Sequence, residues 1–302
     1  MAFTAKDVAA LREKTGCGMM DCKRALTETD GDVDKAIEYL REKGLAAAQK
    51  KASRIAAEGI VSAYVDGKTG VVIEVNSESD FVANNEMFQE FVLGCAKTVA
   101  ETKPADVAEL LTKNFSGTAD TVEAVRQEKV LTIGENLSIR RFATFEGVLE
   151  TYIHMGGKIG VMILLDTDDA TAAKPEFKAM AKNVCMQIAA MNPAYCKKDE
   201  VPAEVIENEK KILKAQAMEE GKPEAIAEKM VMGRIQKYYK ENCLVEQEYV
   251  IDNKMTVAQY VESVAKELGA KIDVVKFVRF EKGEGLQKKE DNFADEVASM
   301  IK

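Results

Sequence analysis

The sequence predicts a multidomain α+β protein. Its 302 residues are enough for two or three compact units with a sizeable buried core. Apolar residues recur every three or four positions in residues 4–44 and 202–239, which is typical of helices with one buried face. They alternate in residues 60–75 and 152–165, which is typical of strands. We therefore expect a three-helix head, a core of two repeated hairpin-plus-helix halves, an inserted antiparallel helical hairpin and a C-terminal helix.

Residues 4–44 carry start and stop signals for three short helices. Thr4 and Asp7 have capping-box spacing, and Gly16 and Gly18 end that helix and begin a tight loop. After a turn at residues 30–31, Asp32 can cap the third helix. An alanine- and lysine-rich run, 46–57, follows and predicts a helical linker with a solvated face, on which we place Lys50, Lys51 and Arg54. Residues 1–54 are expected to form the head domain.

The first core half, residues 55–147, begins with two apolar strands joined by DGKTG at residues 66–70. This run resembles the end of a phosphate-binding loop, but Ser62 stands where the first glycine should be. A hairpin loop in which Gly67 and Gly70 supply positive φ explains it better. We therefore expect no nucleotide to be held by this chain itself. The following helix has an apolar face of Phe88, Phe91, Val92, Cys95 and Val99.

The same plan recurs about ninety positions later. Residues 152–165 again place glycines between two apolar strands, with Gly160 corresponding to Gly70. A helix follows with the apolar face Phe177, Met180, Val184, Cys185 and Ile188. The alternating runs 137–145 and 271–280 should add one strand to each half. The second half is assigned to residues 148–200 and 236–286.

A helical hairpin interrupts the second half. Residues 202–219 and 224–239 are helical, and the break between them contains Gly221 and Pro223. We assign 201–235 to this insert. It is either an arm for self-association or for a partner, or a pair that packs only on its own core; both interpretations remain open. Residues 287–302 are expected to form a C-terminal helical module with Phe293, Val297 and Ile301 on one face.

Composition excludes several functions. A net charge of −9 opposes sequence-independent binding to nucleic acid, so a protein partner is expected instead. No apolar run is long enough to cross a membrane, and no signal peptide is evident, so a cytoplasmic location without membrane attachment is expected. The six cysteines show no CxxC pair and should be reduced, without a disulfide or zinc site. The single histidine, His154, excludes two-histidine metal sites and acid–base pairs.

Five segments resemble bacterial long forms of elongation factor Ts, in the same order. They are LREKTGCGMMDCKRAL (11–26), EVNSESDFVANN (74–85), IGENLSIRR (133–141), GKPEAIAEKMVMGR (221–234) and VRFEKGEG (278–285). The resemblance covers nearly the whole chain. It implies a ubiquitin-associated-like head and a dimerisation-type helical insert. It also implies a guanine-nucleotide exchange factor for elongation factor Tu in protein biosynthesis, with no enzymatic activity, cofactor or metal of its own.

The resemblance also assigns site residues. Ser79, Asp80, Phe81 and Val82 match the segment that dislocates Mg²⁺ on the partner. Composition alone favours a core position for Phe81 and a helix-capping role for Asp80, and the resemblance reverses that preference. Ser79 stands where the family usually has threonine, and Asn84 where it usually has a basic residue.

Further partner-binding residues implied by the resemblance are Leu11, Met19, Met20, Ile133, Gly134 and His154. Because Met19 and Met20 cannot both face one small core, at least one should be exposed. His154 has an equally good interpretation as a solvated loop residue. The implied partner is elongation factor Tu, GDP-bound or nucleotide-free. The rival interpretation is an adaptor whose three-helix head captures another small domain, and a carboxylate-based enzyme lacks any supporting motif.

Overall fold

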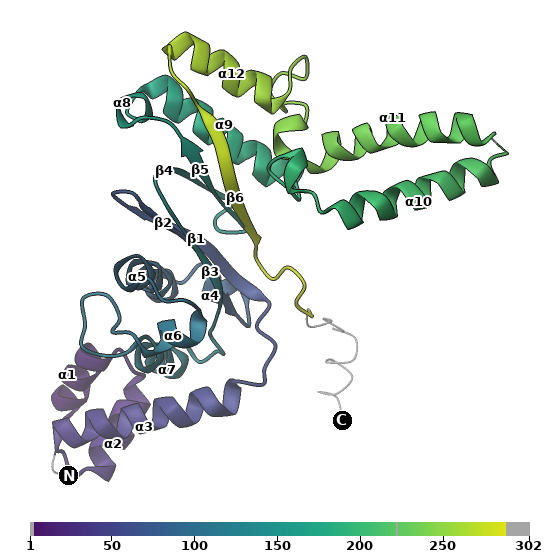
Figure 1. Ribbon diagram of the computed structural model, residues 1–302. Coiled ribbons are helices and arrows are strands. Elements are labelled where there is room, and N and C mark those ends of the chain that lie inside the picture. Colours follow the sequence, from purple (N-terminus) through teal and green to yellow (C-terminus); the bar gives the residue numbers. More distant parts are fainter. Residues whose placement is uncertain (1–2, 222, 288–302) are drawn as a thin grey trace.

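The structure is a computed structural model that describes residues 3–221 and 223–287 (Figure 1). The α+β prediction is confirmed: helices pack around two small antiparallel sheets. The helix expected within the C-terminal module, at residues 289–302, lies outside the described residues.

Three helices open the chain: α1 (Ala5–Thr15), α2 (Met19–Glu28) and α3 (Val33–Lys51). The capping box between Thr4 and Asp7 is present, and Asp32 accepts hydrogen bonds from the backbone at the start of α3. The helices share a small core whose fully buried members are Leu11, Cys22, Ala25, Leu26 and Ala36. Capping and apolar spacing therefore determine these helices locally.

The predicted linker, residues 46–57, is helical as far as Lys51, as expected, but it is not a separate segment. Helix α3 continues through most of it to Lys51 and packs along α7 (Val122–Ile133), with Ala48 4% exposed. Lys50 is exposed, as expected, but the other two basic residues are bonded: Lys51 donates to the carbonyl of Gly134, and Arg54 pairs with Glu78 at 3.4 Å. Charge-rich composition favours solvent exposure on average, but these cations meet acceptors that come from distant parts of the chain.

The first sheet has the order β1 (Glu58–Asp66), β2 (Thr69–Ser77) and β3 (Ser138–Glu146). One-turn helix α4 (Asp80–Ala83) and long helix α5 (Glu86–Thr102) follow β2, and the predicted apolar face of α5 is buried. Helix α6 (Val107–Thr112) and α7 complete this half. Neither was expected from the sequence.

The second sheet repeats this order with β4 (Val148–His154), β5 (Ile159–Asp166) and β6 (Asp273–Glu281). Helix α8 (Asp169–Ala172) and long helix α9 (Pro175–Met191) take the places of α4 and α5. Both middle strands shift register at the same relative point, Glu74/Val75 in β2 and Leu164/Leu165 in β5. Helix α12 (Val257–Leu268), which precedes β6, was not expected.

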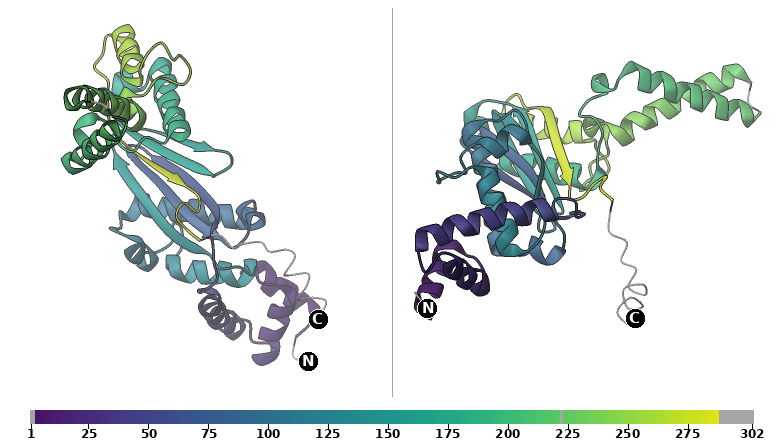
Figure 2. Two further views of the ribbon diagram at one scale, coloured as in Figure 1. Left: turned by 90° about the vertical axis from the view of Figure 1, so that its right-hand side faces the viewer. Right: turned by 90° about the horizontal axis from the view of Figure 1, so that it is seen from below.

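The two sheets pack against each other (Figure 2). Gly70 and Gly160 lie at this contact. The expectation that Gly70 supplies positive φ in the loop is wrong, because Gly70 lies within β2 while Gly67 has φ 56°. A Cβ on Gly70 would lie 2.6 Å from the sulfur of Met162, and one on Gly160 would lie 2.4 Å from Val61. These glycines are needed for close approach of the sheets.

The helical insert consists of α10 (Ala203–Glu219) and α11 (Glu224–Asn242), between two 3₁₀ turns, η1 (Lys198–Glu200) and η2 (Leu244–Glu246). The pair projects away from the sheets (Figures 1 and 2). Ile206, Val231 and Ile235 are buried in it, whereas Ile212 and Met232 are 45% and 61% exposed. The arm buries one stripe and leaves apolar side chains outside.

Candidate partner-binding site

An exposed aromatic tip follows β2. At the first turn of α4, Phe81 is 85% exposed and Asp80 is also exposed, whereas Val82 is 8% exposed and packs into the first-half core. Adjacent residues of a helical turn point about 100° apart, so Val82 anchors the turn while Phe81 faces outward. The arrangement agrees with an outward-facing ring rather than with the core position that composition favours.

The tip is hydrogen-bonded to the loop after α7. The Glu135 carboxylate accepts from the backbone N–H groups of Glu78 and Ser79, both at 3.0 Å, and from the Ser79 hydroxyl at 2.6 Å. In return, the Asn136 N–H donates to Glu78 Oε1 at 2.6 Å. The structure therefore ties the tip to Glu135, the residue that directly follows Ile133 and Gly134 in sequence. Ile133 is half-buried, and Gly134 is exposed with φ 87°.

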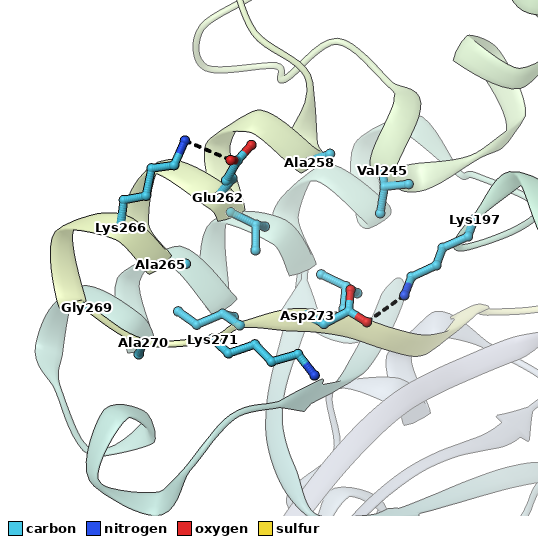
Figure 3. A pocket seen from close by; sticks show the side chains of 13 residues that line it. Lys197, Val245, Ala258, Glu262, Ala265, Lys266, Gly269, Ala270, Lys271 and Asp273 are labelled. Carbon is cyan, nitrogen blue, oxygen red and sulfur yellow. Dashed lines mark hydrogen bonds and ion pairs between the residues drawn. The ribbon is translucent and has the colours of Figure 1, made fainter.

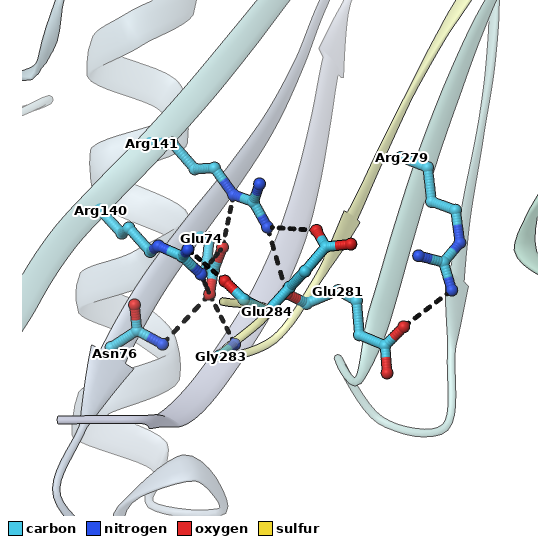
Figure 4. Close-up of polar contacts among 8 residues, drawn as sticks. All are labelled: Glu74, Asn76, Arg140, Arg141, Arg279, Glu281, Gly283 and Glu284. Atoms are coloured by element: carbon cyan, nitrogen blue, oxygen red, sulfur yellow. Dashed lines mark hydrogen bonds and ion pairs between the residues drawn. The ribbon is translucent and has the colours of Figure 1, made fainter. Parts of the chain in front are cut away.

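A buried carboxylate supports the strand that leads to this tip. Glu74 is fully buried in β2 and accepts hydrogen bonds from Arg140 Nη1 at 3.0 Å, Arg141 Nε at 2.6 Å and the Gly283 N–H at 2.8 Å (Figure 4). Burial raises the pKa of Glu74, but the Gly283 N–H and the two guanidinium groups outweigh it and hold the pKa below its ordinary value. Glu74 is therefore a charged acceptor at neutral pH.

This network joins three of the motifs quoted above. Glu74 comes from the second, Arg140 and Arg141 from the third, and Gly283 from the fifth. Gly283 has φ 71°, and a Cβ there would lie 2.4 Å from the Ala57 carbonyl oxygen. The turn after β6 is thereby fixed against the start of β1 and the middle of β2, so the second half braces the strand that carries the tip.

Sequence reasoning missed Glu74, Glu135, Arg140 and Arg141 as supporting residues. A signal for Glu74 was present: a carboxylate between apolar residues in the run VVIEV requires buried cations, and the adjacent arginines of SIRR could supply them. Glu135 had no such signal, because its partners are two backbone N–H groups and a hydroxyl.

The other predicted residues are placed elsewhere. On α2, Met19 and Met20 are 44% and 67% exposed. Leu11 is 1% exposed inside the head core, so its expected place among surface anchors needs correction. Apolar spacing does not tell which face of α1 the other helices cover. His154 ends β4, half-buried, and its Nδ1 is hydrogen-bonded to the Tyr152 hydroxyl at 2.8 Å. Within the described chain, no hydrogen bond or ion pair joins these residues to the tip.

A separate groove of about 470 Å³ lies between α12 and β6 (Figure 3). Its rim carries the ion pairs Lys197–Asp273 and Lys266–Glu262, both at 2.7 Å, over an apolar floor. It contains none of the predicted site residues. The charges at its rim are already paired, so the groove offers no convergent polar constellation for chemistry.

The six cysteines are buried with free thiols, and burial raises the pKa of Cys243 to about 11 and that of Cys196 to about 12. Those two thiols stay protonated at neutral pH, which is a poor state for a nucleophile or metal ligand. Residues 3–221 and 223–287 contain no group of three or more histidine, cysteine or acidic side chains suited to a metal ion. None of the helices there is both long and apolar enough to cross a bilayer.

Comparison with known proteins assigns the family. The family model for elongation factor Ts matches residues 78–284, which include the tip, the Glu135 loop and the turn at Gly283. Elongation factor Ts of Clostridium perfringens is 53% identical over 303 residues, covering 99% of each chain. That of Syntrophotalea carbinolica is 51% identical over 308 residues and covers 100% of each. This chain therefore belongs to the elongation factor Ts family.

Proposed function

We propose that this protein, a nucleotide exchange factor by family, accelerates GDP release by pressing the Asp80–Phe81 tip into the nucleotide-binding domain of elongation factor Tu. The observation that carries the proposal is the 85% exposure of Phe81 on a turn that is anchored by buried Val82 and by the hydrogen bonds of Ser79 to Glu135. Exposing a phenyl ring to water is unfavourable, and a ring held on a rigid support can enter a partner's pocket with little loss of conformational entropy.

The tip would act on the partner's metal and phosphate site. In a nucleotide-binding GTPase, Mg²⁺ bridges the protein to the phosphates and compensates their charge. A ring that displaces the side chains around this site weakens those contacts. Each 1.4 kcal/mol of lost contact accelerates release about tenfold, so roughly 4 kcal/mol would give on the order of a thousandfold. No covalent bond forms, and this chain acts without enzymatic chemistry.

The same coupling also explains how the factor would be released at the end of each exchange cycle. Coupling between two ligands is reciprocal, so a factor that weakens GDP binding is itself weakened when nucleotide rebinds. GTP binding would therefore release the factor, which returns to another GDP-bound elongation factor Tu. This cycle would take place in the cytoplasm.

Further contacts would come from the other predicted residues. Met19 and Met20 offer two adjacent, flexible apolar side chains on the head surface. Leu11 would support that surface from inside the head core. Ile133 and Gly134 directly precede Glu135, which is hydrogen-bonded to Ser79, so they would extend the contact made by the tip, while His154 would add a contact from the second half.

We also propose the domain division inferred from the sequence. The ubiquitin-associated-like head is residues 1–54 and the first core half 55–147. The second half is 148–200 and 236–286, the insert 201–235 and the C-terminal module 287–302. Ile212 and Met232 are exposed on the insert, and covering such apolar surface on association is favourable, so we propose that the insert takes part in self-association.

The direct test measures release of fluorescent GDP from purified elongation factor Tu. Adding the full-length protein at increasing concentration should raise the release rate to a plateau, and the protein should be recovered unchanged. A release rate that does not respond to this chain would refute the proposed function. Recovery of a different small domain by the isolated head, with no effect on GDP, would favour the adaptor interpretation.

A further inference from the structure

The serine before α4 makes an unusual set of hydrogen bonds. Ser79 occupies the N-cap position, where a serine hydroxyl normally accepts from the helix backbone, yet it makes no such side-chain cap. Its hydroxyl instead donates to Glu135 Oε1 at 2.6 Å, and its N–H donates to Glu135 Oε2 at 3.0 Å. The orientation of this turn is therefore set by a side chain 56 positions away in sequence rather than by its own cap.

The same two segments are also tied in the opposite direction. Glu78 Oε1 accepts from the Asn136 N–H at 2.6 Å, and its carboxylate pairs with Arg54 at 3.4 Å. Asn136 in turn donates from its side chain to the Arg54 carbonyl at 3.0 Å. Each segment thus contributes one glutamate that accepts from the backbone of the other.

These hydrogen bonds are well suited to fix the orientation of the turn at Ser79. Hydrogen bonds to a carboxylate are shorter and stronger than neutral ones, and two oxygens fix both position and angle. Ser77 adds a hydrogen bond from its hydroxyl to the Ser79 carbonyl at 2.9 Å. Glu135 and Ser79 are half-buried, so water competes with these bonds less than at a fully exposed site.

We propose that Glu135 is a positioning residue for nucleotide exchange: its carboxylate fixes the turn that aims Phe81, although it does not itself touch the nucleotide. This inference rests on the proposed function of the tip. The physical reason is that Phe81 can enter one particular pocket only if the turn that carries it keeps a fixed orientation. A misplacement of about 1 Å at a reacting or pressing group can cost on the order of a hundredfold in rate.

The test uses the full-length protein and stopped-flow release of fluorescent GDP from elongation factor Tu. Glu135→Ala should lower the plateau rate at saturating factor by about tenfold, since the turn keeps its buried Val82 anchor but loses three hydrogen bonds. Its dissociation constant for nucleotide-free elongation factor Tu should change much less. Glu135→Gln keeps a carbonyl acceptor and should recover most of the rate. Glu90→Ala, an exposed acidic residue on α5, is the matched control and should match the wild type.

A double-mutant cycle separates positioning from general loss of structure. If Glu135 acts through Phe81, adding Glu135→Ala to Phe81→Ala should not slow release further. The positioning role would be overturned if the double variant lost the product of the two single reductions in plateau rate. It would also be overturned if Glu135→Ala alone kept the wild-type plateau rate. Should Glu135→Ala fail to fold by circular dichroism, Ser79→Ala removes one of the three hydrogen bonds and should show a smaller loss in the same direction. If Phe81→Ala itself leaves release unchanged, the proposed function fails rather than this inference.

Discussion

Phe81→Ala is the most direct perturbation of the proposed mechanism, and its size can be worked out from the exposure of the ring. In the free protein the ring is 85% exposed, so its removal should leave the free energy of unfolding nearly unchanged, as for most surface substitutions. Burying a whole phenylalanine side chain is worth about 1.5 to 3 kcal/mol. Burying the exposed 85% in a partner pocket is then worth about 1.3 to 2.6 kcal/mol, which corresponds to roughly a 10- to 80-fold slower release.

The assay is stopped-flow release of fluorescent GDP from elongation factor Tu over a range of factor concentrations. The control is Ile251→Ala, which removes another exposed apolar side chain, 61% accessible, in the loop before α12. The control should behave as the wild type, while Phe81→Ala should have an unchanged melting temperature and a lower plateau. Equal plateaus for Phe81→Ala and the wild type would refute the lever argument.

Three further predictions concern the contact between the sheets, the buried Glu74 and the projecting arm. Gly70→Ala should lower the free energy of unfolding by about 1 to 3 kcal/mol, because the new Cβ would lie 2.6 Å from a neighbouring sulfur. Gly233→Ala in α11, where a Cβ would meet nothing within 4 Å beyond its own stretch of helix, should be neutral or stabilising. Equal losses in the free energy of unfolding for the two variants, measured by urea titration, would contradict the packing argument. The folded pKa of Glu74 is depressed, so its stabilisation is complete above its ordinary pKa of 4.5 and is lost as the pH falls through the folded value. Glu74→Gln should destabilise the protein at pH 7, by less than the roughly 3 to 5 kcal/mol of a fully buried pair because the arginines are partly exposed, and it should flatten the decline in stability below pH 4.5. If the free energy of unfolding of Glu74→Gln declined below pH 4.5 as steeply as that of the wild type, Glu74 would not be the group responsible for this decline. Replacing residues 209–233 of the projecting arm by a short turn should reduce self-association but leave GDP release unchanged, and light scattering that reports the same mass for both proteins would remove the dimerisation idea.

The local elements were largely predictable because local chemistry determines them. Thr4 and Asp7 form their capping box between residues three apart. The face from Phe88 to Val99 on α5 is buried because apolar side chains at helical spacing need cover. Prediction failed where the determining contact is distant. Helices α6, α7 and α12 were not predicted, and Gly70 was assigned to a loop because its neighbour, the Met162 side chain, lies 92 positions further along the chain.

The candidate site divides in the same way. The segment Ser79–Val82 was identified because five motifs resemble one family, and the match over residues 78–284 confirms that family. Exposure was not readable from the motif: Phe81 and Val82 are adjacent apolar residues, yet one is 85% and the other 8% exposed. Leu11 shows the converse, since a residue expected among surface anchors lies in the head core.

From the sequence alone, the α+β class, the repeated hairpins, the inserted pair of helices and the family could be predicted. These follow from spacing and motifs within short stretches of chain. Only the tertiary structure shows that Glu135 is hydrogen-bonded to the turn at Ser79 and that Glu74 is hydrogen-bonded to two other segments of the chain. The physical reason is that hydrogen bonds and buried charges need partners within about 3 Å, and folding brings those partners together from positions that no local pattern connects.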